Sequence, residues 1–254
     1  MKLGISTSSL YPLETEKALE MLALNGIKHT EIFFNSNYEL KEDFVRELKN
    51  IADTYGVNIV SVHPTMSLAE SFMLFSNYER RLKEGLDTFK RYGEIAATLG
   101  ADYVILHGGK PNGILNDYQY CERFMLVNGC VQESGAELLQ ENVFRFRAEK
   151  LDFLKMMVEN LGDKVGFCLD VKQSIRGGYT PFDVISAVGK NIKHLHISDN
   201  GEKGDCLLLG NGSFDFKRLF KEMEALNYKG AYILELYRNA YKEYDELFES
   251  FKRI

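Results

Sequence analysis

The chain has 254 residues, of which 45% are hydrophobic and 27% are charged, a composition that excludes disordered, fibrous and collagen-like proteins. A chain of this length can bury a core without help from disulfides or a structural metal. Its net charge of -6 argues against a nucleic-acid partner and agrees with an enzyme that acts on small molecules.

Short runs rich in β-branched and aromatic residues alternate with longer segments of helical periodicity. The expected strands are Lys2–Ser6, His29–Phe34, Asn58–His63, Tyr103–His107, Glu137–Asn142, Val165–Asp170, Ile192–Ile197 and Ala231–Leu236. The expected helices are Glu14–Leu24, Leu40–Tyr55, Tyr78–Leu99, Tyr120–Glu133, Arg147–Leu161, Pro181–Val188, Phe214–Leu226 and Tyr241–Lys252. This strict alternation predicts one domain over residues 1–254, an α/β fold of the (β/α)8 TIM-barrel type. A doubly wound open sheet is the alternative, but no Gly-rich dinucleotide-binding motif follows the first strand.

Residues at the ends of the expected helices agree with these boundaries. Gly26, Gly56 and Gly100 each follow a helical segment and precede a strand, where a left-handed C-terminal cap favours glycine. Thr180 and Pro181 supply an N-cap and a first-turn proline for the sixth helix. The longest connection, about residues 108–117, follows the fourth strand and is expected over the carboxyl ends of the strands.

The four cysteines are Cys121, Cys130, Cys168 and Cys206, and none of them forms a CxxC pair, so neither a zinc ribbon nor a thioredoxin-type site is indicated. Few, scattered cysteines are typical of a reducing cytosol. The first residues lack the apolar stretch of a signal peptide, and no segment approaches the roughly 20 apolar residues of a membrane span. We therefore expect a cytoplasmic protein without a membrane partner.

Polar side chains that can bind metals or carry protons end six of the expected strands. They are, from the third strand to the eighth, His63, His107, Glu141, Asp170, His196 and Glu235. In (β/α)8 barrels the carboxyl ends of the strands carry the chemistry, so these side chains are expected to meet in one mouth. A charged group that ends an apolar strand is costly to bury unless it is paired or bound to a cation.

The last four of these groups form the strongest candidate site. Glu141, Asp170 and Glu235 would repel one another in a shared mouth, and a divalent cation bound there with His196 would remove that conflict. One imidazole with three carboxylates suits Mn²⁺, Mg²⁺ or Co²⁺ and tolerates Zn²⁺, so we expect one divalent metal ion, with Mn²⁺ as the first choice. The alternative for each residue is a strand end held by a salt bridge.

The segments around these residues resemble the xylose-isomerase-like barrel superfamily of sugar phosphate isomerases and epimerases, which also includes endonuclease IV. The resemblance covers essentially the whole chain. It is strongest over residues 137–236, in the segments ELLQENV, CLDV, IKHLHISDN, LGNGSFDFKRLF and GAYILEL. In the epimerase branch, the residues that match Glu141, Asp170, His196 and Glu235 bind one divalent metal ion. The resemblance therefore implies the same four ligands here.

Two positions depart from the endonuclease branch. Its histidine shortly after the aspartate of the sixth strand is Gln173 here, and its Asp-x-His before the Gly-x-Gly turn reads Gly204-Asp205-Cys206. Glutamine is a poor zinc ligand, so a three-zinc cluster and cleavage of abasic DNA are not expected. Many epimerases also have histidine in place of Gln173, which leaves the identity of the substrate open.

Substrate contacts are expected from six residues, namely His63, His107, Gln173, Lys110, Arg145 and Arg238. The two histidines could instead be neutral residues held by carboxylates, and a second metal is their least favoured role. The cations follow barrel strands and could hold a phosphate or carboxylate, although loop cations are more commonly just solvated. His194, one pleat deeper than His196, is expected to support the site or the core. Glu31 of the second strand could orient a ligand, and a structural ion pair is the favoured interpretation.

The expected reaction is proton transfer next to a carbonyl of a sugar, sugar phosphate or polyol, through an enediolate, with Glu141 and Glu235 as base and acid. Transfer on opposite faces gives epimerisation, and a single shuttling carboxylate gives aldose–ketose isomerisation. A keto-inositol-type dehydratase would use the same proton abstraction, and a non-catalytic sugar-binding barrel is a further alternative. The sequence leaves the oligomeric state open, a homo-oligomer included.

Overall fold

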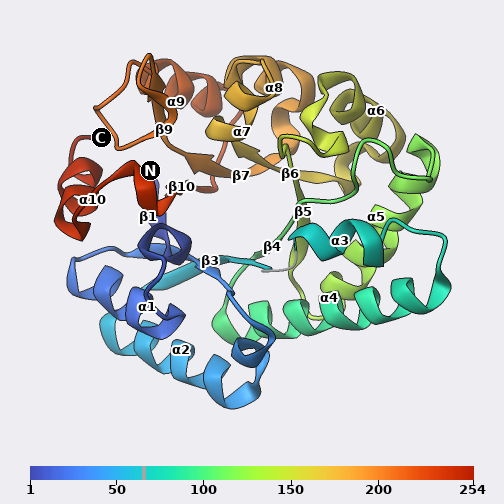
Figure 1. Cartoon of the computed structure of the whole chain (residues 1–254), viewed down its shortest axis with the longest axis horizontal. Helices are drawn as coiled ribbons and strands as arrows, with labels where there is room; N and C mark the ends of the chain where they lie inside the picture. The colour runs from blue at the N-terminus through green and yellow to red at the C-terminus, as the bar shows by residue number, and fades with distance from the viewer. Residues whose placement is uncertain (65–66) are drawn as a thin grey trace.

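The computed structural model describes residues 1–64 and 67–254, and eight parallel strands of this part form a closed barrel (Figure 1). They are β1 (Lys2–Ser6), β2 (His29–Phe33), β3 (Asn58–His63), β4 (Tyr103–Leu106), β5 (Glu137–Glu141), β6 (Gly166–Asp170), β7 (Ile192–Ile197) and β10 (Ala231–Leu234). Each strand pairs with the next in this order, and β1 closes the barrel by pairing with both β2 and β10. The expected (β/α)8 barrel is therefore confirmed.

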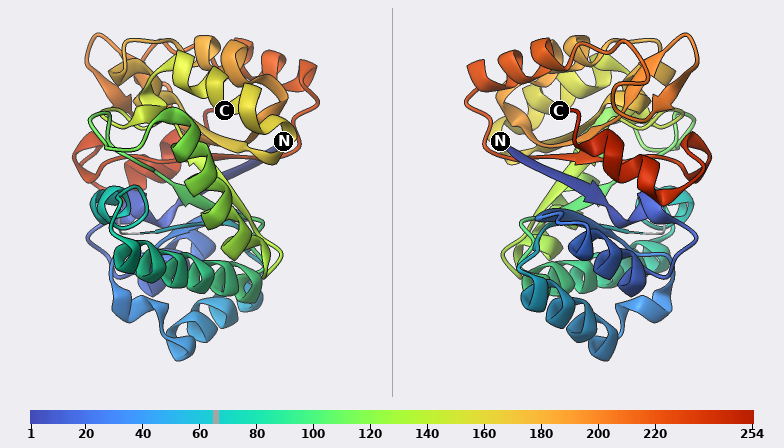
Figure 2. Two further views of the ribbon diagram at one scale, coloured as in Figure 1. Left: turned by 90° about the vertical axis from the view of Figure 1, so that its right-hand side faces the viewer. Right: turned by 90° about the vertical axis from the view of Figure 1, so that its left-hand side faces the viewer.

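Eight helices match the expected ones and form the outer layer around the strands, as the two side views show (Figure 2). They are α1 (Thr15–Leu24), α2 (Glu42–Tyr55), α4 (Glu79–Leu99), α5 (Asp117–Gln132), α6 (Leu151–Leu161), α8 (Pro181–Val188), α9 (Phe216–Ala225) and α10 (Tyr244–Phe251). Each turns an apolar stripe inward. In α2, for example, Val45, Leu48 and Ala52 follow the helical period and are buried. No helix in residues 1–64 or 67–254 is long and apolar enough to cross a membrane.

Three elements over the barrel mouth were not expected. They are the short helices α3 (Ser67–Met73) and α7 (Val171–Arg176) and the antiparallel hairpin of β8 (Asp199–Gly201) and β9 (Gly204–Leu207). They follow the carboxyl ends of β3, β6 and β7. Short 3₁₀ turns complete the described structure, at Thr7–Leu10, Asn37–Leu40, Arg147–Glu149, Gly162–Lys164, Gly189–Asn191 and Arg238–Ala240.

Five of the expected strands are one or two residues too long, and in two of them polar groups outside the sheet take over the last amide groups. β4 ends at Leu106, since the N–H groups of His107 and Gly108 both donate to the Glu70 carboxylate of α3, at 2.9 Å. β10 ends at Leu234, and the N–H of Leu236 donates to the Ser9 hydroxyl. His107 and Glu235 therefore follow their strands directly and do not lie within them.

Helix boundaries were predicted best where a glycine or a proline marks them. Gly56 and Gly100 cap α2 and α4 in the left-handed conformation, with φ of 64° and 78°. Thr180 caps α8 with Pro181 in the first turn. The expected helix from Arg147 instead begins at Leu151 after a 3₁₀ turn, because the Arg147 N–H donates to the carbonyl of Gly109 in another loop.

The interior of the barrel changes from apolar to polar along its axis. Side chains alternate between the two faces of a strand, so positions two apart share a face. Leu139 and Cys168 therefore lie one step below Glu141 and Asp170, and Ile233 lies one step below Glu235; all three are buried apolar positions. These three apolar side chains lie beneath the charged groups at the carboxyl ends of the strands.

Candidate metal centre

Neighbouring strands bring three of the expected metal ligands to the same end of the barrel. Glu141 is paired with Cys168 in the ladder between β5 and β6, and Asp170 is paired with His196 between β6 and β7. Glu141, Asp170 and His196 are each about 1% exposed, and the Glu235 side chain is 14% exposed. The pairing of the strands thus fixes the positions of the Cα atoms from which these side chains extend.

The imidazole of His196 lies among the three carboxylates. Its Nδ1 is 3.1 Å from Oε1 of Glu141, 3.9 Å from Oδ2 of Asp170 and 3.7 Å from Oε2 of Glu235. One ligand atom from each of the four residues lies within 4.8 Å of the others. Ligands bound to one ion at about 2.1 Å are about 3 Å apart when adjacent and about 4.2 Å apart when opposite. The donor set and its spacing therefore fit one hard divalent cation.

Glu31 orients His196 from below. The second imidazole nitrogen of His196, Nε2, lies 3.0 Å from Oε2 of Glu31, and the same oxygen accepts a hydrogen bond from the Ser61 hydroxyl at 2.8 Å. Glu31 is fully buried in β2. A carboxylate behind a metal-binding imidazole fixes its tautomer and ring orientation. The expected ion pair of Glu31 is present, and it leaves Nδ1 of His196 directed at the carboxylates.

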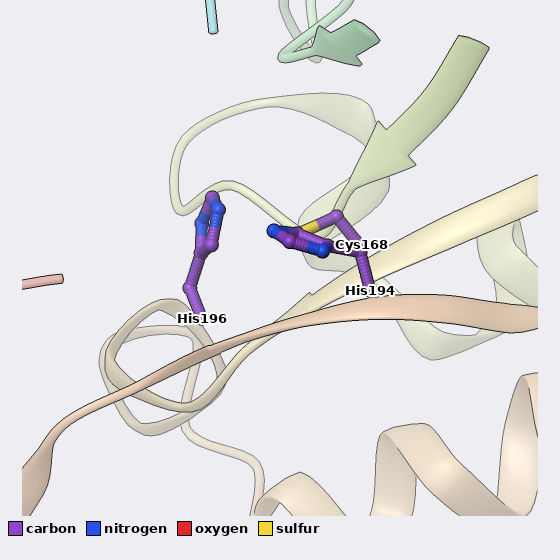
Figure 3. Close-up of side chains that lie close together, drawn as sticks. All are labelled: Cys168, His194 and His196. Carbon is purple, nitrogen blue, oxygen red and sulfur yellow. The ribbon is translucent and has the colours of Figure 1, made fainter. Parts of the chain in front are cut away.

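Cys168 and His194 form the layer directly below His196, and the three side chains converge in the barrel (Figure 3). Nε2 of His194 lies 3.3 Å from Oε2 of Glu31, so both imidazoles share this carboxylate. Burial raises the pKa of the Cys168 thiol, which keeps it protonated. The contact of His194 with Glu31 therefore helps to hold the carboxylate that orients His196.

His63 and His107 approach Glu141 from the other side. Their Nε2 atoms are 3.1 Å apart and lie 3.7 and 2.9 Å from Oε2 of Glu141. That oxygen accepts no well-aligned hydrogen bond from the described residues. His63 holds its ring through Nδ1, which is 3.1 Å from the Pro64 carbonyl. The three atoms have the spacing of ligands and form a second cluster that could hold a cation.

A lysine lies between two of the expected ligands. Nζ of Lys172 donates to Oδ2 of Asp170 at 2.6 Å and to Oε2 of Glu235 at 2.7 Å. Lys172 is 2% exposed and comes from α7, whose N-cap is Asp170. Burial alone would lower the pKa of this ammonium, but the two carboxylates raise it well above its ordinary value.

The pKa values of the carboxylates reflect these different partners. Burial would raise the pKa of Glu141, but the imidazoles around it, first that of His107, hold it well below its usual range. Burial also opposes the lowering of the Glu235 pKa by Lys172 and His196. For Asp170, burial and the neighbouring glutamates outweigh Lys172 and raise the pKa to about 6. The metal-free mouth therefore retains excess negative charge near Asp170.

A cavity of about 300 Å³ opens beside this cluster. Its lining includes Lys172 and Glu235, together with Phe33, Tyr237 and Arg238. The aromatic and apolar lining with a few charged groups is typical of a small-molecule site. The cavity therefore gives a substrate direct access to Glu235.

Two of the expected substrate contacts have other partners. The side-chain oxygen of Gln173 accepts a hydrogen bond from the Phe144 N–H at 3.1 Å, so it ties α7 to the loop after β5. Arg238 lines the cavity, but its guanidinium donates to the carbonyls of Tyr241 and Lys242, at 2.7 and 2.6 Å. Both side chains position the rim through the backbone.

Lys110 and Arg145 lie at the edge of the mouth near His107. Nζ of Lys110 is 3.4 Å from the ring centre of Phe146, and that ring is 5.8 Å from the His107 ring. Arg145 is exposed. Neither cation forms an ion pair within the described part of the chain, so both are available to an anionic group.

Sequence reasoning missed Lys172, although it considered the next residue. One signal was present: cations are disfavoured in the first turn of a helix, because the positive end of the helix dipole lies there. A lysine at that place needs a carboxylate partner, and Asp170 precedes it by two residues. The signal could not be used without the short helix α7, which the sequence analysis did not predict.

Comparisons with known proteins agree with this architecture. Residues 19–254 match the family model described as xylose isomerase-like TIM barrel. An uncharacterized protein of Methanocaldococcus jannaschii is 28% identical over 269 residues, which cover 100% of this chain and 99% of that protein. The structure of a D-tagatose 3-epimerase-like protein superposes with a TM-score of 0.80 at 21% identity, covering 99% of this chain and 95% of that one. The structure of 3-keto-D-glucoside 4-epimerase from E. coli gives a TM-score of 0.79 at 17% identity, with 99% and 98% covered. The chain therefore belongs to the xylose isomerase-like TIM barrel family.

Proposed function

We propose that the protein is a divalent-metal-dependent isomerase or epimerase that transfers a proton next to the carbonyl of a sugar, sugar phosphate or polyol derivative. The observation that carries the proposal is the imidazole of His196 with three carboxylate oxygens within 4 Å of its Nδ1, beside a cavity of about 300 Å³. The sugar epimerases among the structural neighbours support the same class of reaction.

Glu141, Asp170, His196 and Glu235 would hold the metal, with Mn²⁺ the first choice for an oxygen-rich donor set and Mg²⁺, Co²⁺ or Zn²⁺ as alternatives. When bound, the cation would polarise the substrate carbonyl and stabilise the negative charge that develops as the neighbouring proton leaves. Glu31 would keep the His196 ring in place during turnover, because its contact with Nε2 makes Nδ1 the nitrogen that faces the three carboxylates.

Glu141 and Glu235 can act as the acid–base pair, because each has one oxygen near His196 and another directed elsewhere. The second oxygen of Glu141 lies 2.9 Å from the His107 imidazole, and the second oxygen of Glu235 lies 3.5 Å from the Ser8 hydroxyl. Each glutamate therefore has its own polar neighbour through which a proton can leave or arrive. Proton transfer on opposite faces of a sugar requires two such separate routes for the proton.

The edge of the mouth suits a substrate with an anionic group. Lys110 and Arg145 would hold a phosphate there, and His63 and His107 would contact hydroxyl groups deeper in the site. We place the protein in the cytoplasm, in keeping with its four free cysteines. We also propose that the whole chain is one domain, in keeping with the closed barrel.

The test is proton exchange with solvent. Protein reconstituted with Mn²⁺ is incubated in D₂O with a panel of ketoses, ketose phosphates and keto-inositols, and NMR locates the deuterium. Incorporation at one carbon next to the carbonyl is expected, and metal-stripped protein is the control. Incorporation accompanied by loss of water would identify a dehydratase. If no member of the panel exchanges a proton faster than with metal-stripped protein, the proposed reaction class is wrong.

A further inference from the structure

The ammonium group of Lys172 shares two oxygens with the candidate metal site. Oδ2 of Asp170 and Oε2 of Glu235 lie 2.6 and 2.7 Å from Nζ of Lys172. The same two atoms lie 3.9 and 3.7 Å from Nδ1 of His196 on the metal side. One positive charge of the protein is therefore already bound to half of the proposed ligand set.

Lys172 lies at one side of this ligand set. Over residues 1–64 and 67–254 it forms ion pairs with Asp170 and Glu235. The ion pairs of Glu141 are with imidazoles, those of His63, His107 and His196. Lys172 also lines the cavity, with Nζ 5.3 Å from the ring centre of Tyr237. Lys172 is thus bound to two of the four expected ligands, while His196 and Glu141 contact each other at 3.1 Å.

Apart from these two carboxylates and the ring of Tyr237, the position of Lys172 disfavours an ammonium group. Lys172 is 2% exposed, so it has lost most of its hydration, and it lies in the first turn of α7, where the helix dipole opposes a cation. A buried cation held by two carboxylates loses much of its stabilisation when a divalent ion takes charge from the same oxygens.

We propose that Lys172 is a built-in competitor of the divalent cation, which neutralises Asp170 and Glu235 in the metal-free protein and weakens metal binding. The inference rests on the proposed metal centre. Two cations that share two oxygens repel each other, and in a buried mouth little water screens the repulsion. Metal binding therefore weakens the lysine's two ion pairs and leaves its ammonium at the cavity wall, beside the space for substrate.

This inference is tested by whether Mn²⁺ affinity rises or falls when Lys172 loses its charge. Mn²⁺ binding to the metal-stripped full chain is measured by isothermal titration calorimetry for wild type, Lys172→Met and Lys172→Arg. Lys172→Met keeps a long side chain without charge and is expected to bind Mn²⁺ at least tenfold more tightly. Lys172→Arg keeps the charge and is expected to bind no more tightly than wild type. Lys190→Met, which removes an exposed lysine before β7 at the opposite end of the barrel, is the matched control and should bind like wild type.

Thermal unfolding gives a second readout that needs no substrate. Metal-free Lys172→Met should unfold at a lower temperature than wild type, because Asp170 and Glu235 lose their counter-charge, and Mn²⁺ should raise its Tm by more than it raises that of wild type. Lys172→Gln, which can still donate hydrogen bonds to both carboxylates, serves if the methionine variant does not fold. It is expected to show the same gain in Mn²⁺ affinity.

The outcomes separate this inference from the proposed metal centre. Binding by Lys172→Met but not by wild type would support the competition most strongly. If wild type binds Mn²⁺ and the neutral variants bind it equally well or more weakly, the competition is wrong. Lys172 would then be a group that orders the ligands. Absence of binding in wild type and in every neutral variant would overturn the metal centre itself, and the competition with it.

Discussion

On the β3–β5 side of the mouth, Glu141 is surrounded by the imidazoles of His63, His107 and His196. On the β6–β10 side, Asp170 and Glu235 are bridged by the ammonium group of Lys172. The imidazoles hold the pKa of Glu141 well below its usual range, whereas the pKa of Asp170 is raised to about 6 despite the lysine. Glu141 therefore has more cationic neighbours than Asp170 and Glu235, and the β6–β10 side is where the proposed cation would balance the most negative charge.

The largest effect is expected from removing a carboxylate on that side. Asp170→Ala should abolish stoichiometric Mn²⁺ binding, because it removes a ligand and also frees Lys172 from one of its two partners. Wild type should bind about one ion per chain, measured by metal analysis after reconstitution and gel filtration. Asp170→Asn is the control for folding, since its side-chain oxygen can still accept the Gln173 N–H at the start of α7. If Asp170→Ala binds Mn²⁺ as well as wild type, the assignment of the metal site is wrong.

The second prediction compares one glutamate from each side. Glu141→Gln and Glu235→Gln keep the shape of the side chain but cannot carry the proton, so each should lower kcat by about 10²-fold or more, with a smaller effect on KM. Deuterium wash-in from D₂O, with each epimer of a substrate found by the exchange panel, measures the two faces separately. One variant should still exchange the proton of one epimer without inverting it, and the other variant should show the opposite preference. Near wild-type inversion in both variants would rule out both glutamates as the base, and His63 or His107 would become the first candidate.

The smallest effect is expected from removing the ion pair that holds α7, the helix that carries Lys172. The guanidinium of Arg176 forms an ion pair with Asp205 of β9 and donates to the Tyr237 hydroxyl at 2.9 Å. Asp205→Asn should lower the free energy of unfolding by less than about 1 kcal/mol at pH 7, because the pair is partly exposed to solvent. Urea denaturation measures the loss. A loss of several kcal/mol would show that α7 depends on this pair far more than its exposure implies.

The pH dependence of that loss has a definite sign. The hydrogen bond from Arg176 lowers the pKa of Asp205 below its ordinary value, so the pair stabilises the fold above the ordinary carboxyl pKa, and this contribution disappears as the pH falls through the lowered one. The difference between wild type and Asp205→Asn should therefore shrink in acid. Asp163→Asn removes an exposed ion pair away from α7 and serves as the matched control.

The barrel and the four candidate ligands could be predicted from the sequence, because both depend on local patterns. Alternating strands and helices are visible in the sequence, and the parity of a strand directs Glu141, Asp170 and His196 to the same interior. The contacts of Gln173 and Arg238 could not be predicted, because they depend on where loops from different units meet. Gln173 of α7 contacts the backbone of Phe144 in the loop after β5, a pairing that no local pattern specifies.

The closing strand β1 has a consequence for the newly synthesised chain. Ser6 donates a hydrogen bond to Glu31, 25 residues later, but Ser8 reaches Glu235 across 227 residues. At about 5–20 residues per second, the ribosome needs roughly 11–45 s to make the segment between Ser8 and Glu235. During this interval one edge of β1 lacks its partner strand, and unpaired edges promote association between chains. The mouth is complete only once β10 has been made, so its carboxylates acquire their final neighbours only after Glu235 has been added to the chain.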